Sequence, residues 1–375
     1  MSLLALSLFL ACPPPVNPGD SGDSEADTDT DTDTDSDTDA DTDSDTDTDV
    51  VEHSHAVFTT TNYEVGSLAV VDLSDQSVDE STDIPSDAAV VAEDGQVFLL
   101  GRYGYDYVRI YDPAQGFATP VLEFSVGDAA NPQDLEICGD KLVVSKYGSA
   151  SLGVYDPATG NVAGSVDLSS YADEDGIPEA TELVEAGGML YVSLNGLDQD
   201  NGWVGVGGQV LQVDCGSWTV TDAWDIGGNT SISAWDDSRI FVTHDAFGEV
   251  PAGLSILDPG NDSFETVLSY DQWTTLPLSV VETNGTALVV LRDGSYNYGW
   301  QCFDSETWAS KGDATMTNWF LGGAALSSQG QAWIPAGSHW SNTADSLGAV
   351  VADPADCSEQ GVAEATLGGS SVALY

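Results

Sequence analysis

The chain has 375 residues, with 63 acidic residues against 7 Lys and Arg, so its formal net charge is −56. This charge excludes a nucleic-acid binder that works by neutralising phosphates and disfavours docking to anionic lipid through a basic patch. The 10 Trp and 13 Tyr exclude wholesale disorder, and 39 Gly with 15 Pro favour a turn-rich β protein.

Residues 1–12 have the pattern of an export signal. The apolar run in residues 1–11 is too short for a transmembrane helix, which needs about 20 residues, but it suits the apolar region of a signal. The sequence Leu8-Phe9-Leu10-Ala11-Cys12 resembles the lipoprotein box of bacteria, in which a small residue precedes a lipid-modified Cys. The resemblance implies lipidation of Cys12 and, with Pro13 rather than Asp next, sorting to the outer membrane or cell surface. The alternative is an ordinary export signal with an incidental Cys.

Residues 13–52 predict a disordered tether. Asp alternates with Thr, Ser or Ala from Asp27 to Asp49, and residues 20–52 hold 16 acidic residues and no Lys or Arg. In a strand, one face would consist of mutually repelling carboxylates, so no core can form. Calcium-binding repeats that alternate Asp need Gly at the turn, and no Gly occurs between Ser24 and Val65. We therefore expect an extended spacer.

Residues 53–375 contain a sevenfold repeat. Seven apolar runs end in Asp, often Asp-Pro, at intervals of 40 to 58 residues, and Asp in such a turn bonds its own backbone. These residues are Asp72, Asp112, Asp156, Asp214, Asp258, Asp304 and Asp353. Seven alternating runs precede them, at Val57, Val97, Leu142, Leu190, Ile240, Leu288 and Trp333. A third set of seven completes the pattern, and its last member, LGGSSVALY, is the end of the chain.

This arrangement predicts an all-β fold, a seven-bladed β-propeller of four-stranded antiparallel blades. With strands a to d counted from the axis outward, the N-terminal blade lacks its a strand, and the C-terminal strand supplies it. Such closure removes free sheet edges. Each blade then has about 46 residues, which suits four strands. No segment keeps a helical period over ten or more residues, which excludes a two-domain α/β protein.

The repeat resembles the YVTN-repeat family of propellers. The matching segments are Leu190-Tyr191-Val192-Ser193 and Ile240-Phe241-Val242-Thr243-His244. The resemblance covers nearly all of residues 55–375 and implies the fold, but it implies no activity, because propellers include binding modules and enzymes alike.

Basic and polar residues recur where the b strands end. We call this set the b–c column: Asn62, Arg102, Lys146, Asn195, His244, Arg292 and, after a slip in register, His339. Aromatic residues follow closely, among them Tyr103, Tyr147 and Trp340. A polar ring with aromatic walls suits a small anionic or sugar-like ligand. The alternative is structural: in a body of net charge −40, these bases neutralise acids of neighbouring loops.

Two further groups of residues suggest a site and a framework. Asp173, Asp175, Asp198 and Asp200 stand near Gly in the longest interval of the repeat, and such spacing resembles half of a calcium loop. The alternative is that these acidic loops are only solvated. Calcium is the one cofactor that the sequence suggests.

Cys138, Cys215, Cys302 and Cys357 allow three disulfide pairings. Their places in neighbouring blades favour Cys138–Cys215 and Cys302–Cys357, and free buried thiols are the alternative.

Three functions remain open. The first is a binding or interaction module, a monomer anchored to the membrane by its lipid, whose partner is a protein, a glycan or a small molecule. The second is a propeller enzyme of the lactonase or lyase type, and the third is a structural component of the envelope. The sequence has neither the Gly-x-Ser-x-Gly elbow nor the His-Glu-x-x-His motif, so enzymes built on those motifs are not supported.

Overall fold

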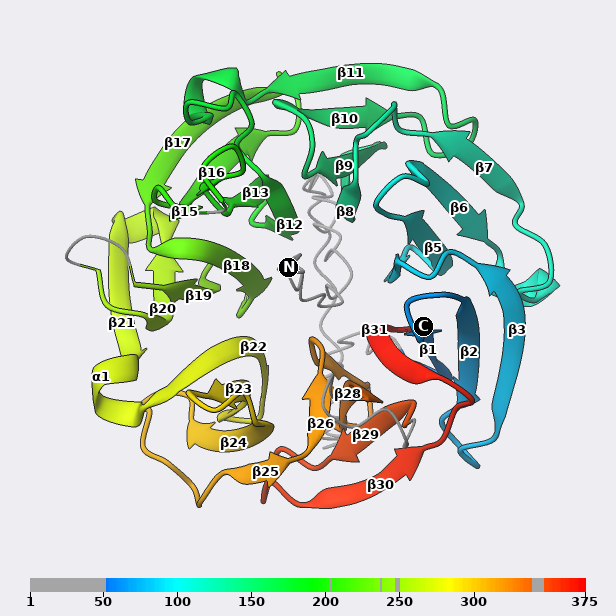
Figure 1. The fold of residues 1–375 in the computed structure, drawn as a ribbon, viewed down its shortest axis with the longest axis vertical. Coiled ribbons are helices and arrows are strands. Elements are labelled where there is room, and N and C mark those ends of the chain that lie inside the picture. Colours follow the sequence, from blue (N-terminus) through cyan, green and yellow to red (C-terminus); the bar gives the residue numbers. More distant parts are fainter. Residues whose placement is uncertain (1–51, 203, 237, 247–249, 339–346) are drawn as a thin grey trace, which may run out of the picture.

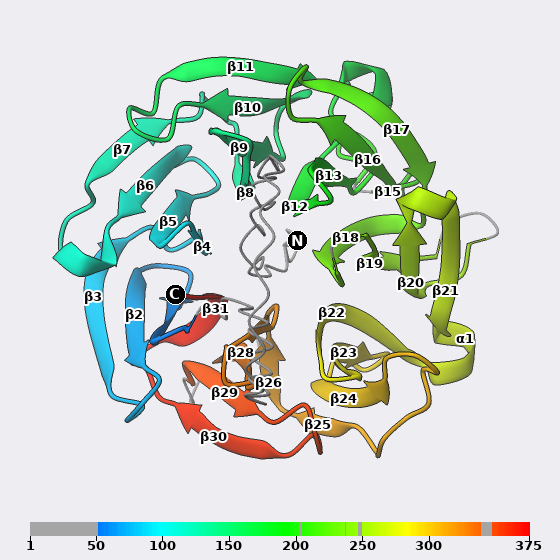
Figure 2. The same cartoon turned by 180° about the vertical axis from the view of Figure 1, so that it is seen from behind.

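The computed structural model describes residues 52–375 except 203, 237, 247–249 and 339–346. Seven antiparallel sheets stand in a ring about a central axis (Figure 1), and the view from behind shows the same ring (Figure 2). The predicted seven-bladed propeller is confirmed. Blade 1 contains the N-terminal strand of the ring, and the blades are numbered in chain order.

The four strands of each blade follow the predicted order, from the axis outward. The inner, or a, strands are β31 (Gly368–Leu374), β4 (Ala88–Glu93), β8 (Pro132–Cys138), β12 (Ala180–Ala186), β18 (Gly228–Ala234), β22 (Thr275–Thr283) and, in blade 7, β26 (Trp319–Leu321) with β27 (Ala325–Leu326). The b strands are β1 (His55–Thr61), β5 (Gln96–Gly101), β9 (Lys141–Lys146), β13 (Met189–Leu194), β19 (Ile240–Asp245), β23 (Thr286–Asp293) and β28 (Ala332–Ser338).

The outer half of each blade is equally regular. The c strands are β2 (Gly66–Asp72), β6 (Tyr107–Tyr111), β10 (Ser151–Tyr155), β16 (Gln209–Asp214), β20 (Gly253–Asp258), β24 (Tyr298–Asp304) and β29 (Ala349–Ala352). The d strands, which form the rim in Figure 1, are β3 (Val78–Ile84), β7 (Leu122–Ser125), β11 (Val162–Asp167), β17 (Thr219–Asp225), β21 (Ser263–Ser269), β25 (Thr315–Thr317) and β30 (Glu359–Ala363).

Few elements lie outside this plan. A small hairpin, β14 (Leu197–Asp198) with β15 (Val204–Gly205), extends the b–c loop of blade 4. The helical segments are α1 (Tyr270–Trp273) and the 3-10 turns η1 (Pro113–Gln115), η2 (Ser169–Tyr171) and η3 (Pro259–Asn261). Within the described part of the chain, no helix has the length and apolar character needed to cross a membrane.

The ring closes through the two ends of the repeat. Strand β1 pairs with β2 on one side and, from Ala56↔Leu374 to Thr61↔Gly368, with β31 on the other. The backbones of His55 and Tyr375 exchange hydrogen bonds at 3.0 Å, and their rings stack 5.1 Å apart. The C-terminal strand therefore completes the N-terminal blade, as predicted.

Each repeated Asp terminates its c strand as the sequence predicts. All seven side chains accept a backbone N–H two or three residues further on, at 2.7–3.2 Å. The turn is therefore stabilised by local hydrogen bonds, because the side chain replaces the backbone acceptor that the strand no longer supplies.

The core is divided among the blade interfaces. Seven clusters of buried apolar side chains each join two neighbouring blades. Hydrogen bonds between inner strands add to this packing: Leu183 N–H donates to Asp134 Oδ2 (2.8 Å), and Ala324 N–H donates to Ser279 Oγ (3.1 Å). Neighbouring inner strands are thus held in register by side chains.

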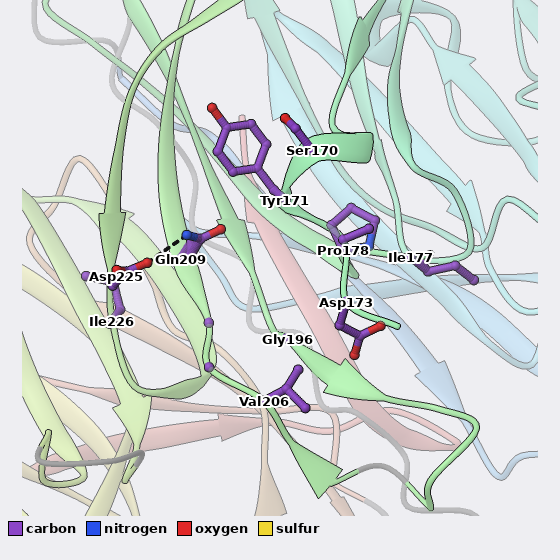
Figure 3. Close-up of a pocket in the computed structure, with 13 residues that line it drawn as sticks. Ser170, Tyr171, Asp173, Ile177, Pro178, Gly196, Val206, Gln209, Asp225 and Ile226 are labelled. Atoms are coloured by element: carbon purple, nitrogen blue, oxygen red, sulfur yellow. Dashed lines mark hydrogen bonds between the residues drawn. The ribbon is translucent and has the colours of Figure 1, made fainter. Parts of the chain in front are cut away.

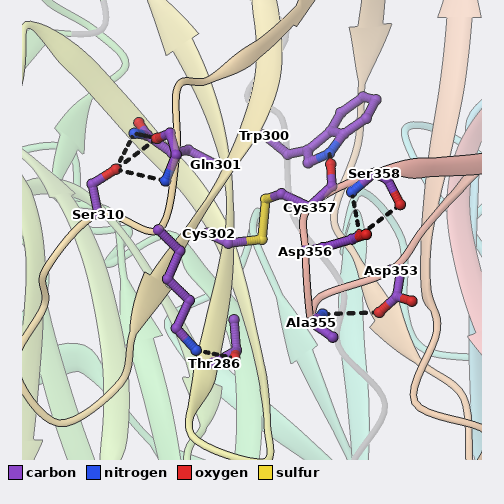
Figure 4. The surroundings of a disulfide bond; sticks show 12 residues. Thr286, Trp300, Gln301, Cys302, Ser310, Asp353, Ala355, Asp356, Cys357 and Ser358 are labelled. Carbon is purple, nitrogen blue, oxygen red and sulfur yellow. Dashed lines mark hydrogen bonds between the residues drawn. A yellow bond between two sulfur atoms is a disulfide. The ribbon is translucent and has the colours of Figure 1, made fainter.

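Both disulfides favoured by the sequence are present. Cys138 at the end of β8 is bonded to Cys215 just past β16, and their Cα atoms are 5.5 Å apart. Cys302 on β24 is bonded to Cys357 in the c–d turn of blade 7, with Cα atoms 5.7 Å apart. Trp300 Nε1 donates to the carbonyl of Cys357 at 3.1 Å (Figure 4). The bonds join blades 3 and 4, and blades 6 and 7.

Candidate functional site on the loop face

One face of the propeller carries the b–c loops and the d–a connections, and we call it the loop face. The b–c column reaches this face in register: Asn62, Arg102 and Asn195 directly follow their b strands, and Lys146, His244 and Arg292 occupy strand ends. His339 and Trp340 lie outside the described residues. The sequence therefore placed the column at the right end of each described strand, but the side chains differ in their surroundings.

Arg102 is engaged by its own blade and by the next one. Its guanidinium forms an ion pair with Asp87 at 2.6 Å and donates to Gln133 Oε1 at 3.3 Å. Asp87 is the residue just before β4, and Gln133 belongs to β8. Arg102 thus compensates a loop carboxylate, as the structural alternative predicts.

The other bases of the loop face are also in contact with protein groups. The Arg292 guanidinium carbon lies 4.7 Å from the centre of the Tyr296 ring. Burial raises the pKa of Asp245, and the positive charge of Arg292 opposes this shift. Lys146 is half-buried, and burial lowers its pKa; its Nζ lies 3.4 Å from Ser151 Oγ. The position of Arg292 near Asp245 favours neutralisation over anion binding, whereas the contact of Lys146 is with a neutral hydroxyl group.

Three column or wall residues are buried. His244 Nε2 lies 2.7 Å from Ser255 Oγ, and burial lowers the pKa of His244 to about 4, so the ring is neutral at pH 7. Asn195 and Tyr147 are likewise inside the fold. This corrects the expectation that these three side chains line an open face, because neighbouring groups cover each of them, as Ser255 contacts the His244 ring.

Three of the four candidate calcium ligands come together. Asp173, Asp175 and Asp198, the acidic trio, offer oxygen atoms that all lie within 4.8 Å of one another. Asp173 and Asp175 belong to the d–a connection before β12, and Asp198 belongs to β14, so the fold joins residues that are 25 positions apart. Asp200 is exposed and is not part of the group.

The trio has one oxygen that the protein does not use. Asp173 Oδ1 accepts the N–H of Asp175 at 2.9 Å, whereas Asp173 Oδ2 is buried and receives no hydrogen bond from a described donor. Burial raises the pKa of Asp173, and the charges of Asp175 and Asp198 add to this effect. Carboxylate oxygens in this arrangement are ligands that calcium accepts.

A buried carboxylate lies beneath the trio. Glu179 accepts the N–H of Leu197 at 3.0 Å and the side-chain amide of Gln199 at 3.1 Å. Burial raises its pKa to about 7, with smaller contributions from the charges of Asp175 and Asp173. The loops around the trio are thus tied to the start of the inner strand β12.

A cavity of about 630 Å³ adjoins the acidic trio (Figure 3). Its walls are apolar at Ile177, Pro178 and Val206, and polar at Tyr171, Gln209 and the two carboxylates Asp173 and Asp225. Gln209 Nε2 donates to Asp225 Oδ1 at 2.7 Å, which orients both groups along one wall. The volume lies within the usual range for small-molecule sites, about 300–1,000 Å³.

Sequence reasoning missed this cavity, although one signal marked it. Tyr171, Gln209 and Asp225 stand far apart in the chain and match no motif. The 58-residue interval between Asp156 and Asp214, the longest in the repeat, supplies most of the lining. An interval above the repeat length indicates loop insertion, and inserted loops of repeat proteins gather on one face, often the binding face.

Comparisons with known proteins support the fold alone. No protein-family model matches the chain, and no curated protein resembles it in sequence. Among solved structures, a putative 6-phosphogluconolactonase from Bacteroides fragilis is similar, with a TM-score of 0.60 and 9% identity over 87% of this chain and 99% of that one. Apo AztD from Citrobacter koseri has a TM-score of 0.51 and 13% identity, over 86% of this chain and 97% of that one. Kuenenia stuttgartiensis hydrazine synthase has a TM-score of 0.53 and 17% identity, over 77% of this chain and 90% of that one. A lactonase and a hydrazine synthase catalyse different reactions, so the structural similarity supports the propeller fold and indicates no specific activity.

Proposed function

We propose that this chain is a ligand-binding propeller of the bacterial cell envelope, whose primary site is the cavity beside the acidic trio. The observation that supports this proposal is the cavity itself, because a preformed hollow with apolar walls and a few oriented polar groups is typical of ligand sites. We further propose YVTN-type ancestry for the blades and a lipid anchor at Cys12, followed by an acidic tether. Residues 1–51 lie outside the described part of the chain, so anchoring and localisation stay predictions.

The lining of the cavity favours a neutral polyhydroxylated or a cationic small ligand. The 13 described lining residues include Asp173 and Asp225 and no Lys, Arg or His. An anion would meet two carboxylates without a compensating charge, and burial of an uncompensated like charge is costly. Of the two ligand classes that the sequence suggested, the sugar-like class therefore agrees with the cavity.

The first alternative is an enzyme, which needs a reacting group. The cavity supports this alternative less well than it supports binding. The acidic trio belongs to the connection from blade 3 to blade 4 and to the b–c loop of blade 4, whereas we would expect a metal-dependent propeller enzyme to gather its carboxylates on the axis. The second alternative is a structural component of the envelope, which would bind no ligand in the cavity. One experiment, in which the cavity is filled by a substitution, separates both alternatives from the binding function.

The test fills the cavity by one substitution. Val206 lines the cavity, and Val204 lies two residues away on the same loop, exposed and outside the lining. The full chain is screened by thermal unfolding against neutral polyols, monosaccharides and small amines. We expect at least one compound to raise the melting temperature, Val206→Trp to abolish that rise, and Val204→Trp to retain it. No stabilising compound, or a rise that survives in Val206→Trp, would refute the proposal, and turnover of a bound compound would favour the enzyme.

A further inference from the structure

The cavity beside the acidic trio has negative groups in its lining. Asp173 and Asp225 are its charged residues, and they come from different elements: Asp173 belongs to the d–a connection before β12, and Asp225 ends the rim strand β17 (Figure 3). Among the described residues of the lining there is no Lys, Arg or His. The lining therefore does not compensate its own charge.

The acidic trio concentrates negative charge at one edge of this cavity. Asp173 lines the cavity, and oxygen atoms of Asp175 and Asp198 lie within 4.8 Å of one of its oxygens. The ion pairs that the described residues form engage other carboxylates, namely those of Asp72, Asp87, Glu123, Asp140 and Asp236. Three carboxylates thus lie together without an ion pair to a described base, and their mutual repulsion favours a cation among them.

One oxygen of the trio is available to a ligand. Both oxygens of Asp175 are used by the protein, since they accept the N–H groups of Ile177 and Gln199 at 2.8 and 3.0 Å. Asp173 Oδ1 accepts the N–H of Asp175, whereas Asp173 Oδ2 is buried and receives no hydrogen bond from a described donor. A buried acceptor without a partner costs free energy that a donor from a ligand would recover. An ammonium group supplies donors and the compensating charge together.

The rest of the cavity fits a carbon skeleton rather than a bare metal ion. Ile177, Pro178 and Val206 supply apolar walls, and Tyr171 lines the same space (Figure 3). A metal ion at the trio would leave these walls uncovered, whereas a carbon skeleton attached to an ammonium group would bury them. The face of an aromatic ring also attracts cations. The volume of about 630 Å³ is that of a small-molecule site.

The backbone around the cavity is held in place by the fold itself. Val206 N–H donates to the carbonyl of Gly196 at 2.8 Å, and Gly208 N–H donates to the carbonyl of Gly227 at 2.7 Å. Gly196 has a φ of +56°, and a Cβ at this position would collide with the carbonyl oxygen of Gly207. A wall that is fixed in this way loses little conformational entropy when a ligand binds.

We propose that this cavity binds an organic amine, whose ammonium group lies at Asp173 and whose carbon skeleton covers the apolar walls. This inference rests on the proposed function, because it assigns a ligand class to the same cavity. Of the two classes that agree with the lining, it selects the cation, since a neutral polyol would leave the charges of the trio uncompensated.

Pairs of compounds of similar shape that differ in charge test this proposal. Benzylamine is compared with benzyl alcohol, and 1,5-diaminopentane with 1,5-pentanediol, by isothermal calorimetry on the full chain at neutral pH with EDTA present. We expect at least one amine to bind, and the matched alcohol to bind at least tenfold more weakly, because the alcohol carries no charge.

Two variants of the trio locate the ammonium group. Asp173→Asn should lower the affinity of that amine at least tenfold without lowering the melting temperature, because Asn keeps an oxygen for the N–H of Asp175. Asp198→Asn removes a charge of the trio, leaves Asp173 in place and should also weaken the amine. The matched control is Asp128→Asn, which removes one exposed charge from the d–a connection before β8 and should bind as wild type does.

Several outcomes would overturn the amine site. Amines that do not bind, or that bind no better than their alcohols, would refute it. Wild-type affinity in both trio variants would also refute it, and an equal loss in Asp128→Asn would show general attraction to an acidic surface. Amine binding that survives in Val206→Trp would place the amine outside the cavity.

The proposed function has a separate outcome. A monosaccharide or polyol that stabilises wild type but not Val206→Trp, without amine binding, would leave the cavity function standing and refute the amine alone. Absence of binding by both classes of compound would refute both.

Discussion

At the scale of single residues, the acidic side chains of this protein have two distinct roles. The seven repeated Asp residues are exposed or half-buried and accept backbone N–H groups in c–d turns; the hydrogen bonds from Ser217, Thr307 and Ser74 lower the pKa of Asp214, Asp304 and Asp72. The acidic trio differs, because its buried oxygen on Asp173 receives no hydrogen bond from a described donor. Aspartate thus ends the c strands in the c–d turns, whereas in the acidic trio it provides a candidate ligand for a cation.

Calcium should stabilise the wild-type chain through Asp173. We expect 5 mM calcium to raise the melting temperature by about 3 °C relative to EDTA, since a ligand that binds only the folded state stabilises it. Asp173→Asn should melt at a higher temperature than wild type in EDTA, because a like charge is removed, and should gain nothing from calcium. The control Asp200→Asn alters an exposed acid outside the trio and should respond to calcium as wild type does. Equal calcium responses of wild type and Asp173→Asn would contradict this prediction.

At the scale of elements, the inner strands β4, β8 and β12 carry carboxyl groups inside the fold. Asp134 and Glu136 of β8 and Glu182 of β12 are buried, and Glu136 donates a hydrogen bond to Glu93 at the end of β4. Burial raises the pKa of Glu93 to about 7 and that of Glu136 well above its usual range. The charge of Glu93 raises the pKa of Glu136 further, whereas the hydrogen bond from Glu136 partly offsets the rise for Glu93. At moderately acidic pH both carboxyl groups are therefore protonated in the folded chain, and Glu93 loses its proton near pH 7.

This pair makes the protein less stable as the pH rises. The unfolded chain releases the Glu93 proton near pH 4.5, whereas the folded chain keeps it to about pH 7, so between these values the folded state binds more protons and the free energy of unfolding falls with pH. The raised pKa of Glu136 acts in the same direction. For Glu93 alone the change is about 3 kcal/mol. Urea unfolding at pH 5 and 7.5 should show the loss, and Glu93→Gln/Glu136→Gln should reduce it and be more stable than wild type at pH 7.5. The exposed control Glu265→Gln should keep the wild-type difference; a double variant that also keeps it would exclude the pair as the cause.

At the scale of the whole molecule, stability depends on a closed ring. Every core cluster spans two blades, so a missing strand exposes an interface and the edge of β1 together. The C-terminal strand β31 occupies that place, and its last residue lies beside His55. The a–b connection of blade 1 is thus the one interrupted by the termini, while the other six blades have continuous a–b hairpins.

Removal of residues 368–375 should therefore prevent native folding. We expect the truncated chain to aggregate or to lose its near-ultraviolet circular dichroism, because β1 loses its inner partner and Phe58 and Val57 lose packing neighbours. Gel filtration and circular dichroism measure both effects. The matched control moves residues 366–375 in front of residue 53 through a short turn, which restores the a–b hairpin of blade 1 and should restore the fold. A truncated chain that remains monomeric with a native spectrum would contradict the closure argument.

The sequence alone determined the architecture, because its signals are local. The Asp turns and the alternating apolar runs each act over a few residues, and their sevenfold repetition made weak signals agree. The closure of the ring followed from the order of the repeats, because one strand set is split between the two ends of the chain. The sequence also favoured the two disulfides, since strand order placed Cys138 beside Cys215 and Cys302 beside Cys357. The long interval of the repeat also contains the candidate calcium ligands, and the fold brings three of the four together.

Only the tertiary structure decided how the side chains of the loop face are used. Whether a base faces solvent depends on neighbours from other strands, as when Arg102 meets Asp87 and Gln133 while His244 is buried against Ser255. The cavity and the buried carboxyl pair likewise join residues from separate strands. Local chemistry determined the blades, whereas contacts between strands and loops that are distant in sequence determined the surroundings of the charges and the cavity from which function is inferred.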